Sequence, residues 1–214
     1  MSYILAIESA IYGGSAALLK DETVVGEWIG TEPRGSSDQL LPNIKKMIEM
    51  AGISRRQLNV IAVSNGPGSY TGIRIGIATA LGLAAALGID ATGISILEAM
   101  ALSFGDSGLV TSAIPFGRDQ IAFQTFNRSS DIAAEAIDEP EAASFDQFIS
   151  SKSLNSCRSI VVNQTLYERL ADTVDQNTIG GDWINAGHNL ALAIGRAVNK
   201  TGFLRPPEAI YVRN

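Results

Sequence analysis

A glycine-rich segment between an apolar strand and a long apolar helix constrains this chain more than any other feature. Residues 59–63 read Asn-Val-Ile-Ala-Val, a β-branched run typical of a buried strand. Residues 77–89 contain no proline and are rich in alanine and leucine, which favours a helix. Gly66-Pro67-Gly68-Ser69 must turn the chain sharply between them, because glycine tolerates positive φ and proline fixes φ near a turn value. Ser69 or Thr71 can then cap the first N–H groups of the helix.

A strand, a tight turn and a helix start in this order can bind an anion. The turn presents unpaired N–H donors, and the helix dipole places its positive end beside them. A βα turn without any ligand explains the same residues, and both interpretations stay open. The candidate phosphate-loop residues are Ser9, Gly13 and Gly14 near the start of the chain, with Gly66, Gly68 and Ser69 in the glycine-rich turn.

The helix after the turn is apolar on almost all sides and contains several glycines. Gly72, Gly76, Gly82 and Gly88 each cost about 1 kcal/mol relative to alanine in a helix interior, so they mark places where another backbone comes close. An apolar circumference predicts cover on most sides, either within the domain or from a second chain. With about 20 residues and Thr79 inside it, the helix is not a convincing membrane span.

The glycine-rich segment also resembles a family signature. Residues 66–74 read GPGSYTGIR and are close to GPGSFTG-[VI]-R, the signature of the bacterial tRNA threonylcarbamoyladenosine biosynthesis protein family TsaB, also called YeaZ. Residues 39–42 match the end of the family's H-S-x-x-L-L-P motif, with Ser36 in place of the histidine. The chain ends in IYVRN, which is similar to the family's closing P-x-Y-x-R. The resemblance covers most of residues 1–101 and, loosely, the rest.

The order of expected elements agrees with the fold of that family. Three strands, then helix, strand, helix and strand, is typical of α/β proteins with the actin-like ATPase or ribonuclease H-like fold (the ASKHA superfamily). We expect two lobes, an N-terminal actin-like lobe over 1–103 and a reduced C-terminal lobe over 104–214. The expected strands of the first lobe are 3–7, 15–19, 23–29 and 59–63, with helices at 38–51 and 71–88 and a turn and short strand over 88–94. In the second lobe, a last helix is expected from about residue 185 to 200.

Two positions at which relatives carry ligand side chains differ here. TsaB proteins commonly have aspartate after the first strand, whereas this chain has Glu8, either a ligand or a strand-end carboxylate satisfied by nearby N–H groups. The related catalytic subunit TsaD carries His-x-x-x-His, which places two metal ligands on one helix face. Ile96 and Met100 occupy these positions and cannot bind a hard cation, so no metal site is predicted.

Composition narrows the classes of partner and compartment. A net charge of −6 argues against a broad basic surface that binds nucleic-acid phosphates unaided. The single Cys157 excludes an internal disulfide and fits a reducing cytosol, and no basic stretch precedes the first apolar run as in a signal peptide. We therefore expect a cytoplasmic protein without a membrane partner. Arg118 and His188 are interpreted as solvated or structural, although Arg118 could bind phosphate or carboxylate.

The resemblance implies a non-catalytic subunit of the machinery that places a threonylcarbamoyl group on adenosine beside the tRNA anticodon. It implies pairing with TsaD and the ATPase TsaE, a homodimer when the chain is alone, and tRNA contact only through the complex. No catalytic residue and no cofactor are expected on this chain alone; ATP or ADP at the subunit junction stays open. The predicted interface residues are Leu40, Ile44, Met47, Ile48, Gly72, Ile73, Gly76, Ile77 and Ala80.

Two other classes of function stay open from the sequence. A small-molecule phosphotransferase of the same superfold would bind ATP and magnesium, and the change to Glu8 speaks against it. A metal-dependent hydrolase follows from the kinship with TsaD, and Ile96 and Met100 speak against that class.

Overall fold

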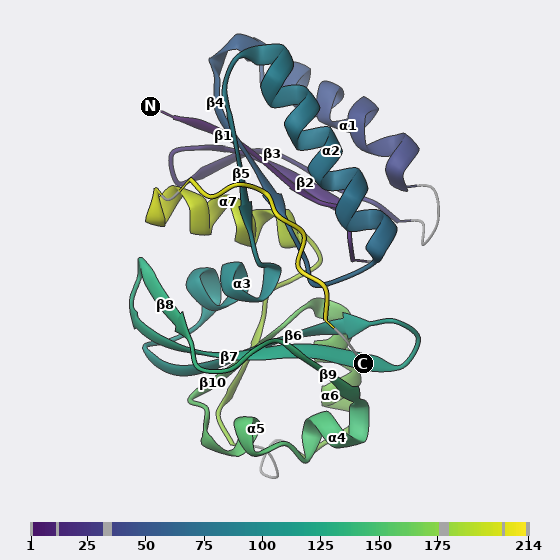
Figure 1. The fold of residues 1–214 in the computed structure, drawn as a ribbon, viewed down its shortest axis with the longest axis vertical. Coiled ribbons are helices and arrows are strands. Elements are labelled where there is room, and N and C mark those ends of the chain that lie inside the picture. Colours follow the sequence, from purple (N-terminus) through teal and green to yellow (C-terminus); the bar gives the residue numbers. More distant parts are fainter. Residues whose placement is uncertain (1, 12, 32–35, 176–179, 203, 213–214) are drawn as a thin grey trace.

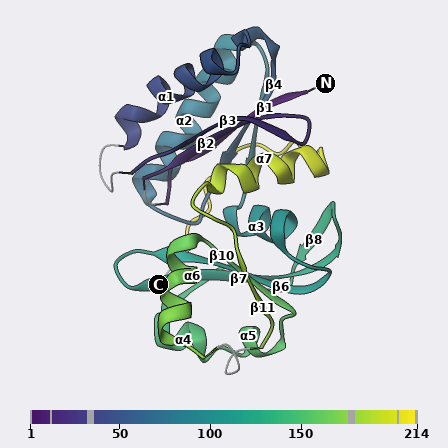
Figure 2. The same ribbon diagram turned by 180° about the vertical axis from the view of Figure 1, so that it is seen from behind.

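The computed structural model describes residues 2–11, 13–31, 36–175, 180–202 and 204–212. Two lobes, each built on its own sheet, lie one above the other along the long axis of the molecule (Figure 1). Two helices, α3 (Ile96–Phe104) and α7 (Leu190–Thr201), lie between the two sheets and pack the lobes together (Figure 1, Figure 2). The chain is therefore a two-lobed α/β protein, as the order of elements predicts.

The first lobe contains a five-stranded sheet in the order β3-β2-β1-β4-β5. Strands β1, β2 and β3 are antiparallel neighbours, whereas β4 and β5 run parallel to β1. Its elements are β1 (Tyr3–Glu8), β2 (Ser15–Lys20), β3 (Thr23–Ile29), α1 (Ser36–Met50), the 3-10 helix η1 (Arg55–Gln57), β4 (Leu58–Ser64), α2 (Tyr70–Leu87), β5 (Asp90–Ile94) and α3 (Ile96–Phe104).

The second lobe repeats this pattern with shorter helices. Its sheet has the order β11-β10-β6-β7-β8, and β9 also pairs with β7. Helices α4 and α5 have 5 residues each, against 15 in α1 and 18 in α2. The elements are β6 (Gly108–Phe116), β7 (Gln120–Ser130), β8 (Ala133–Ala136), β9 (Glu141–Ser144), α4 (Phe145–Ile149), α5 (Lys152–Ser156), β10 (Ser159–Val162), α6 (Gln164–Thr173), β11 (Asp182–Asn185) and α7 (Leu190–Thr201).

Both faces of the sheet are buried at β1, β2 and β4, as expected for strands rich in apolar residues. Side chains alternate along a strand, so Leu5 and Ile7 of β1 pack under α1 and α2, whereas Ala6 packs against α7. Helices α1 and α2 lie side by side on one face of this sheet, and α7 lies on the other (Figure 1, Figure 2). Consequently α1 and α2 have one side against the sheet and the opposite side toward solvent.

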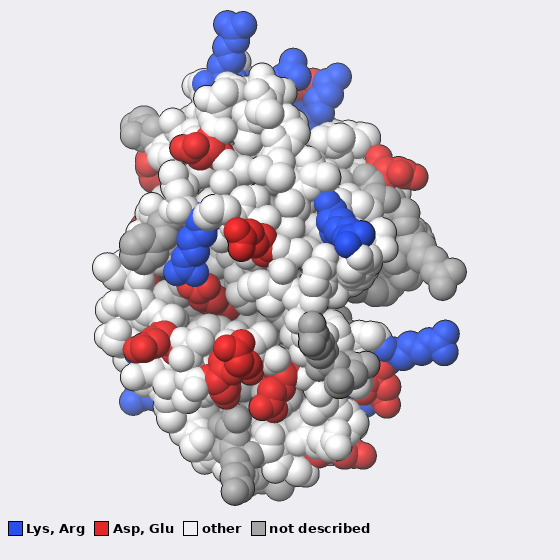
Figure 3. Space-filling model, viewed as in Figure 1, with Lys and Arg blue, Asp and Glu red and all other residues white. Residues whose placement is uncertain are grey.

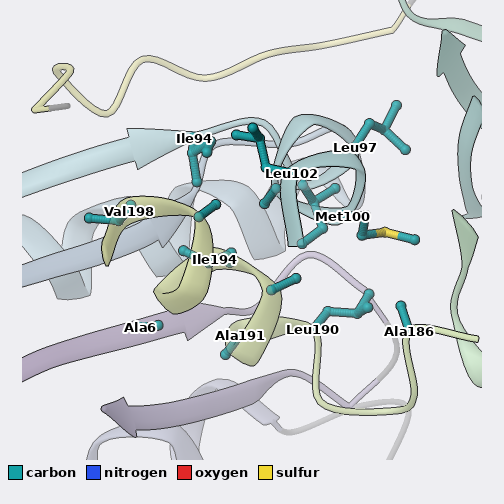
Figure 4. Packing of buried hydrophobic residues seen from close by; sticks show 14 of the residues in the cluster. Ala6, Ile94, Leu97, Met100, Leu102, Ala186, Leu190, Ala191, Ile194 and Val198 are labelled. Carbon is teal, nitrogen blue, oxygen red and sulfur yellow. The ribbon is translucent and has the colours of Figure 1, made fainter. Parts of the chain in front are cut away.

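The layer between the lobes is a single apolar cluster. Met100 of α3 and Ile194 of α7 lie in it with no exposed area, together with Phe126 of the second sheet (Figure 4). Helix α7 comes from the range predicted for the second lobe, yet it packs directly on the first sheet. A Cβ at Gly195 would lie 2.3 Å from the Leu19 side chain and 3.3 Å from the Ala6 Cβ, so a larger residue there would displace Leu19.

The chain after α7 returns across the first lobe as an extended segment, which we call the C-terminal strap (residues 204–212; Figure 1). The N–H of Gly93 donates to the Arg205 carbonyl at 2.8 Å, and the N–H of Ile210 donates to the Asn65 carbonyl at 2.7 Å. These bonds fasten the strap along β5 and the glycine-rich turn.

One expected element of the second half differs from the structure. The sequence predicts a helix from about residue 185 to 200, but α7 begins at Leu190, and residues 182–185 form β11. Gly187 has a φ of +78°, which a right-handed helix cannot include, so His188 precedes the helix. A four-residue strand contains too few apolar positions to be distinguished from the start of an amphipathic helix.

The two kinds of glycine in α2 can be separated by substitution. A Cβ at Gly72 would lie 2.2 Å from the Ser9 carbonyl oxygen, whereas a Cβ at Gly82 would meet nothing within 4 Å. We expect Gly72→Ala to lower the free energy of unfolding by about 1–3 kcal/mol through overpacking. Gly82→Ala, the matched control, should raise it by about 0.5–1 kcal/mol through helix propensity. Urea denaturation measures both, and equal effects would contradict the assignment of Gly72 to a close contact.

Candidate functional site

A cleft with a volume of about 1090 Å³ opens between the two lobes. Its walls are the turn after β1, the first turn of α2, the β6–β7 hairpin, the start of α6 and the end of the C-terminal strap. Phe116, Tyr70 and Tyr211 supply aromatic surface, and Asn163 supplies an amide. None of the described lining residues carries a formal charge. The cleft is therefore a neutral, largely apolar space.

The turn after β1 and the glycine-rich turn are bonded to each other. The Ser9 hydroxyl donates to the Gly72 carbonyl at 2.8 Å, and the Ser69 N–H donates to the Ala10 carbonyl at 2.8 Å. The Ser69 hydroxyl accepts from the Gly72 N–H at 3.3 Å and so caps α2, as predicted. Much of the hydrogen-bonding capacity of these turns is thus used inside the chain.

The six candidate phosphate-loop residues do not form one site. Gly68 and Ser69 line the cleft. Gly13 and Gly14 turn the chain at the end of the sheet, where the Gly30 N–H donates to the Gly14 carbonyl at 2.9 Å. Gly66 lies beneath the strap, and Ser9 bonds to α2 as described above. An anion site made by these two turns stays a prediction.

Glu8 is a buried carboxylate that bonds to the backbone of its own turn. It is 2 % exposed, and its Oε1 accepts from the N–H of Ala10 at 2.5 Å and of Ile11 at 3.0 Å. Burial raises the pKa of the Glu8 carboxyl to about 7, and the two backbone bonds lower it only in part. Of the two interpretations of Glu8, the structure confirms the carboxylate satisfied by nearby N–H groups.

The two helix positions at which the sequence predicts no metal ligand lie in the core. Ile96 and Met100 are both 0 % exposed and belong to the apolar layer between the lobes. Among the described residues, no group of three or more His, Cys, Asp or Glu could hold a metal ion.

Arg118, interpreted from the sequence as solvated, is exposed at the tip of the β6–β7 hairpin.

Most of the residues predicted for an interface are buried inside this chain. Eight of the nine are buried, and Ile77 is half-buried. Ile73 and Ala80 of α2, for example, have no exposed area. A partner could therefore reach α1 and α2 only through the opposite side of each helix. Whether these helices form an interface stays a prediction.

The solvent side of the two helices is nonetheless apolar, and sequence reasoning did not single out most of its residues. Large exposed side chains lie on α1 at Leu41 (49 %) and Met50 (78 %), and on α2 at Tyr70 (53 %) and Leu81 (47 %). We call these four residues with Ile77 the helix-pair surface. The molecular surface over α2 is almost free of charged side chains (Figure 3).

The charge pattern could have located this side on α1 but not on α2. Lys45, Lys46 and Glu49 mark the solvent side of α1, whereas Arg74 is the one charged residue of α2. Among the described helices, α2 is the one that is long and apolar enough to cross a membrane. Core helices of globular proteins meet the same criterion. Only 28 % of it is buried, so an apolar side is left uncovered.

This chain is similar in sequence to proteins of one known family. The family model of TsaD, described as tRNA N6-adenosine threonylcarbamoyltransferase, matches residues 30–194. The chain belongs to the TsaD family. Its resemblance to TsaB is confirmed as well: it is 34 % identical to TsaB of Bacillus subtilis over 119 residues, and 39 % identical to TsaB of Escherichia coli over 98 residues.

These matches to TsaB are partial in length. The first covers 55 % of this chain and 52 % of the relative, and the second covers 46 % and 42 %. The chain thus spans about half the length of the curated relatives it matches.

Solved structures confirm the fold of this TsaD-family chain. YeaZ from Pseudomonas aeruginosa has a TM-score of 0.71 at 18 % identity, and covers 99 % of this chain and 100 % of that one. The activator of 2-hydroxyisocaproyl-CoA dehydratase from Clostridium difficile, solved with bound ADPNP, has a TM-score of 0.58 at 10 % identity, covering 94 % of both chains. The predicted actin-like, two-lobed fold is therefore confirmed.

The raised pKa of Glu8 predicts a specific pH dependence. Because the folded pKa of about 7 lies above the ordinary value of 4.5, the folded state favours the protonated carboxyl. This contribution to stability is fully present below pH 4.5 and is lost as the pH rises through 7, an effect of up to about 3 kcal/mol. Glu8→Gln should therefore flatten the decrease of the melting temperature between pH 5 and pH 8.

The matched control is the exposed Glu22, and Glu22→Gln should leave the decrease unchanged. Differential scanning calorimetry across the pH series measures both. A Glu8→Gln profile parallel to the wild type would contradict the assignment of this titration to Glu8.

Proposed function

We propose that this chain is a TsaB-type, non-catalytic subunit that binds the catalytic subunit TsaD and supports threonylcarbamoyl transfer to adenosine beside the tRNA anticodon. The single observation that carries the proposal is the apolar helix-pair surface, which a TsaD-family chain exposes on the side of α1 and α2 away from its own sheet. Large exposed apolar surfaces on folded proteins commonly mark interaction sites. The names of the curated relatives support the process in which it acts.

The geometry of α2 suits close packing against another helix. Tyr70, Ile77 and Leu81 recur at helical spacing and lie on one side of the helix. Gly82 and Ala85 are exposed next to Leu81, and small residues there let a second backbone approach closely. A subunit of the same fold offers an equivalent helix pair, so the complex would be a bundle of four helices.

The same surface accounts for the other partners in the proposal. A second copy of this chain would cover it when TsaD is absent, which gives a homodimer. TsaE and tRNA would be bound through the complex, since the net charge of −6 disfavours direct binding of nucleic acid. The site of action would be the cytoplasm, where tRNA is modified.

The chemistry of the cleft supports a non-catalytic role over a phosphotransferase. Kinases of this kind need charged groups that hold nucleotide phosphates and a metal ion. The described lining of the cleft has none, and its largest side chains are aromatic. The Glu8 carboxyl is buried and accepts hydrogen bonds from its own turn, so it is not free to bind a metal ion or a nucleotide.

Leu81→Glu tests the interface directly. We expect the affinity for TsaD to fall by about 30-fold or more, the loss typical of a charge placed in an apolar contact of about 2 kcal/mol. Isothermal titration calorimetry with TsaD from the same genome measures it. Leu81 serves better than Gly76, because a Cβ at Gly76 would lie 2.4 Å from the Ser9 hydroxyl and would disturb the fold.

The matched control is Ile132→Glu, which changes an exposed apolar residue of the second lobe (56 %) and should leave the affinity unchanged. Threonylcarbamoylation of tRNA by TsaD and TsaE, measured with and without each variant, should follow the affinities. Wild-type affinity of Leu81→Glu would remove α2 from the interface.

A further inference from the structure

The C-terminal strap is anchored to the first lobe at two separate places. At the first, the Arg205 N–H donates to the Thr92 hydroxyl at 2.9 Å, and its guanidinium donates to both Glu98 oxygens at 2.9 Å. A Cβ at Gly93 would lie 2.5 Å from the Cα of Pro207, so the strap lies directly on β5. Such an anchor holds the strap against the edge strand of the sheet.

The second anchor is the glycine-rich turn. Ile210 donates its N–H to the Asn65 carbonyl at 2.7 Å, and a Cβ at Gly66 would lie 2.4 Å from the Ile210 carbonyl oxygen. The residue after Ile210 therefore has a defined position beside the first turn of α2, although it comes from the other end of the sequence.

Tyr211 forms an exposed cluster with Tyr70 and Arg74 at that position. The two tyrosine rings are 5.2 Å apart between centroids, and the Arg74 guanidinium lies 3.9 Å from the centre of the Tyr70 ring. The Arg74 Nε donates to the Tyr211 hydroxyl at 3.4 Å. Tyr211 is nevertheless 46 % exposed and Tyr70 53 % exposed, so the two rings, which also line the cleft, keep about half of their surface open to solvent.

We propose that the C-terminal strap is part of the partner-binding surface, with Tyr211 extending the helix-pair surface beyond the first turn of α2. This inference rests on the proposed function, since it assigns an additional contact to the same partner subunit. Tyr70 is shared by both surfaces, so they are continuous. Tyrosine and arginine held in place before binding are the residues that contribute most to protein interfaces, because little side-chain entropy is lost on contact.

A protein partner fits this cluster better than RNA does. Arg74 is the one cation of the cluster among the residues that the structure describes, and the chain as a whole carries a charge of −6. Binding of single-stranded nucleic acid requires a positively charged groove beside the stacking rings. The neighbouring residues along α2, Ile77 and Leu81, instead continue the cluster as an apolar ridge.

The affinity of the full chain for TsaD tests the strap. We expect Tyr211→Ala to weaken binding about tenfold and Tyr211→Phe to stay within about twofold, because the ring and not the long hydrogen bond of its hydroxyl supplies the contact. Leu204→Ala is the matched control on the same segment, exposed by 55 % but before the anchors, and should bind as the wild type does.

A photo-crosslinking residue gives a measurement that does not depend on a loss of stability. p-Benzoylphenylalanine at position 211 should crosslink to TsaD, and the same residue at position 204 should not. Wild-type affinity of Tyr211→Ala, or crosslinking from position 211 to tRNA alone, overturns the role of the strap. If Leu81→Glu abolishes binding in that case, the proposed function stands and the strap inference alone fails.

Discussion

The contact between α2 and the turn after β1 is the constraint on which the rest of the structure depends. Gly72 and Gly76 bring the helix backbone against Ser9 and Ala10, where no side chain would fit. This contact fixes which side of α2 faces the sheet. It also holds together the two turns that form one wall of the cleft, and it places Tyr70 where the strap reaches it. If α2 lay at an ordinary distance from the sheet, its orientation, the contact between the two turns and the position of Tyr70 would not be fixed.

The sequence predicts the first lobe well, because its signals are local. The apolar runs and the glycine-rich turn define β4 and α2 to within a residue or two. The signal is weaker where elements are short. Strands β8, β9 and β11 have four residues each, and their stability comes from pairing with other strands of the second sheet.

The candidate site shows a different limit of sequence reasoning. Glycines in a helix indicate close approach of a backbone, but not which backbone. Gly72 and Gly76 face this chain's own turn, whereas Gly82 faces solvent, and the sequence contains no signal that separates them. An apolar residue in a helix likewise does not show whether its own chain or a partner covers it. The predicted contact residues Leu40 and Ile44 of α1 are covered by this chain, whereas Leu41 is exposed. The contact between Tyr211 and Tyr70, on which the proposed role of the strap rests, could not be predicted from the sequence because the two residues are 141 positions apart.

Under the proposed function, the exposed Gly82 would affect how much of this protein a cell retains. Alanine at that position would make the isolated helix more stable, so the chain retains a less stable form of the surface that we assign to a partner. A partner that binds only the folded chain stabilises it by mass action, and more so as its free concentration rises. Copies without a partner would unfold more often and would be degraded first, which would keep the two subunits in balanced amounts.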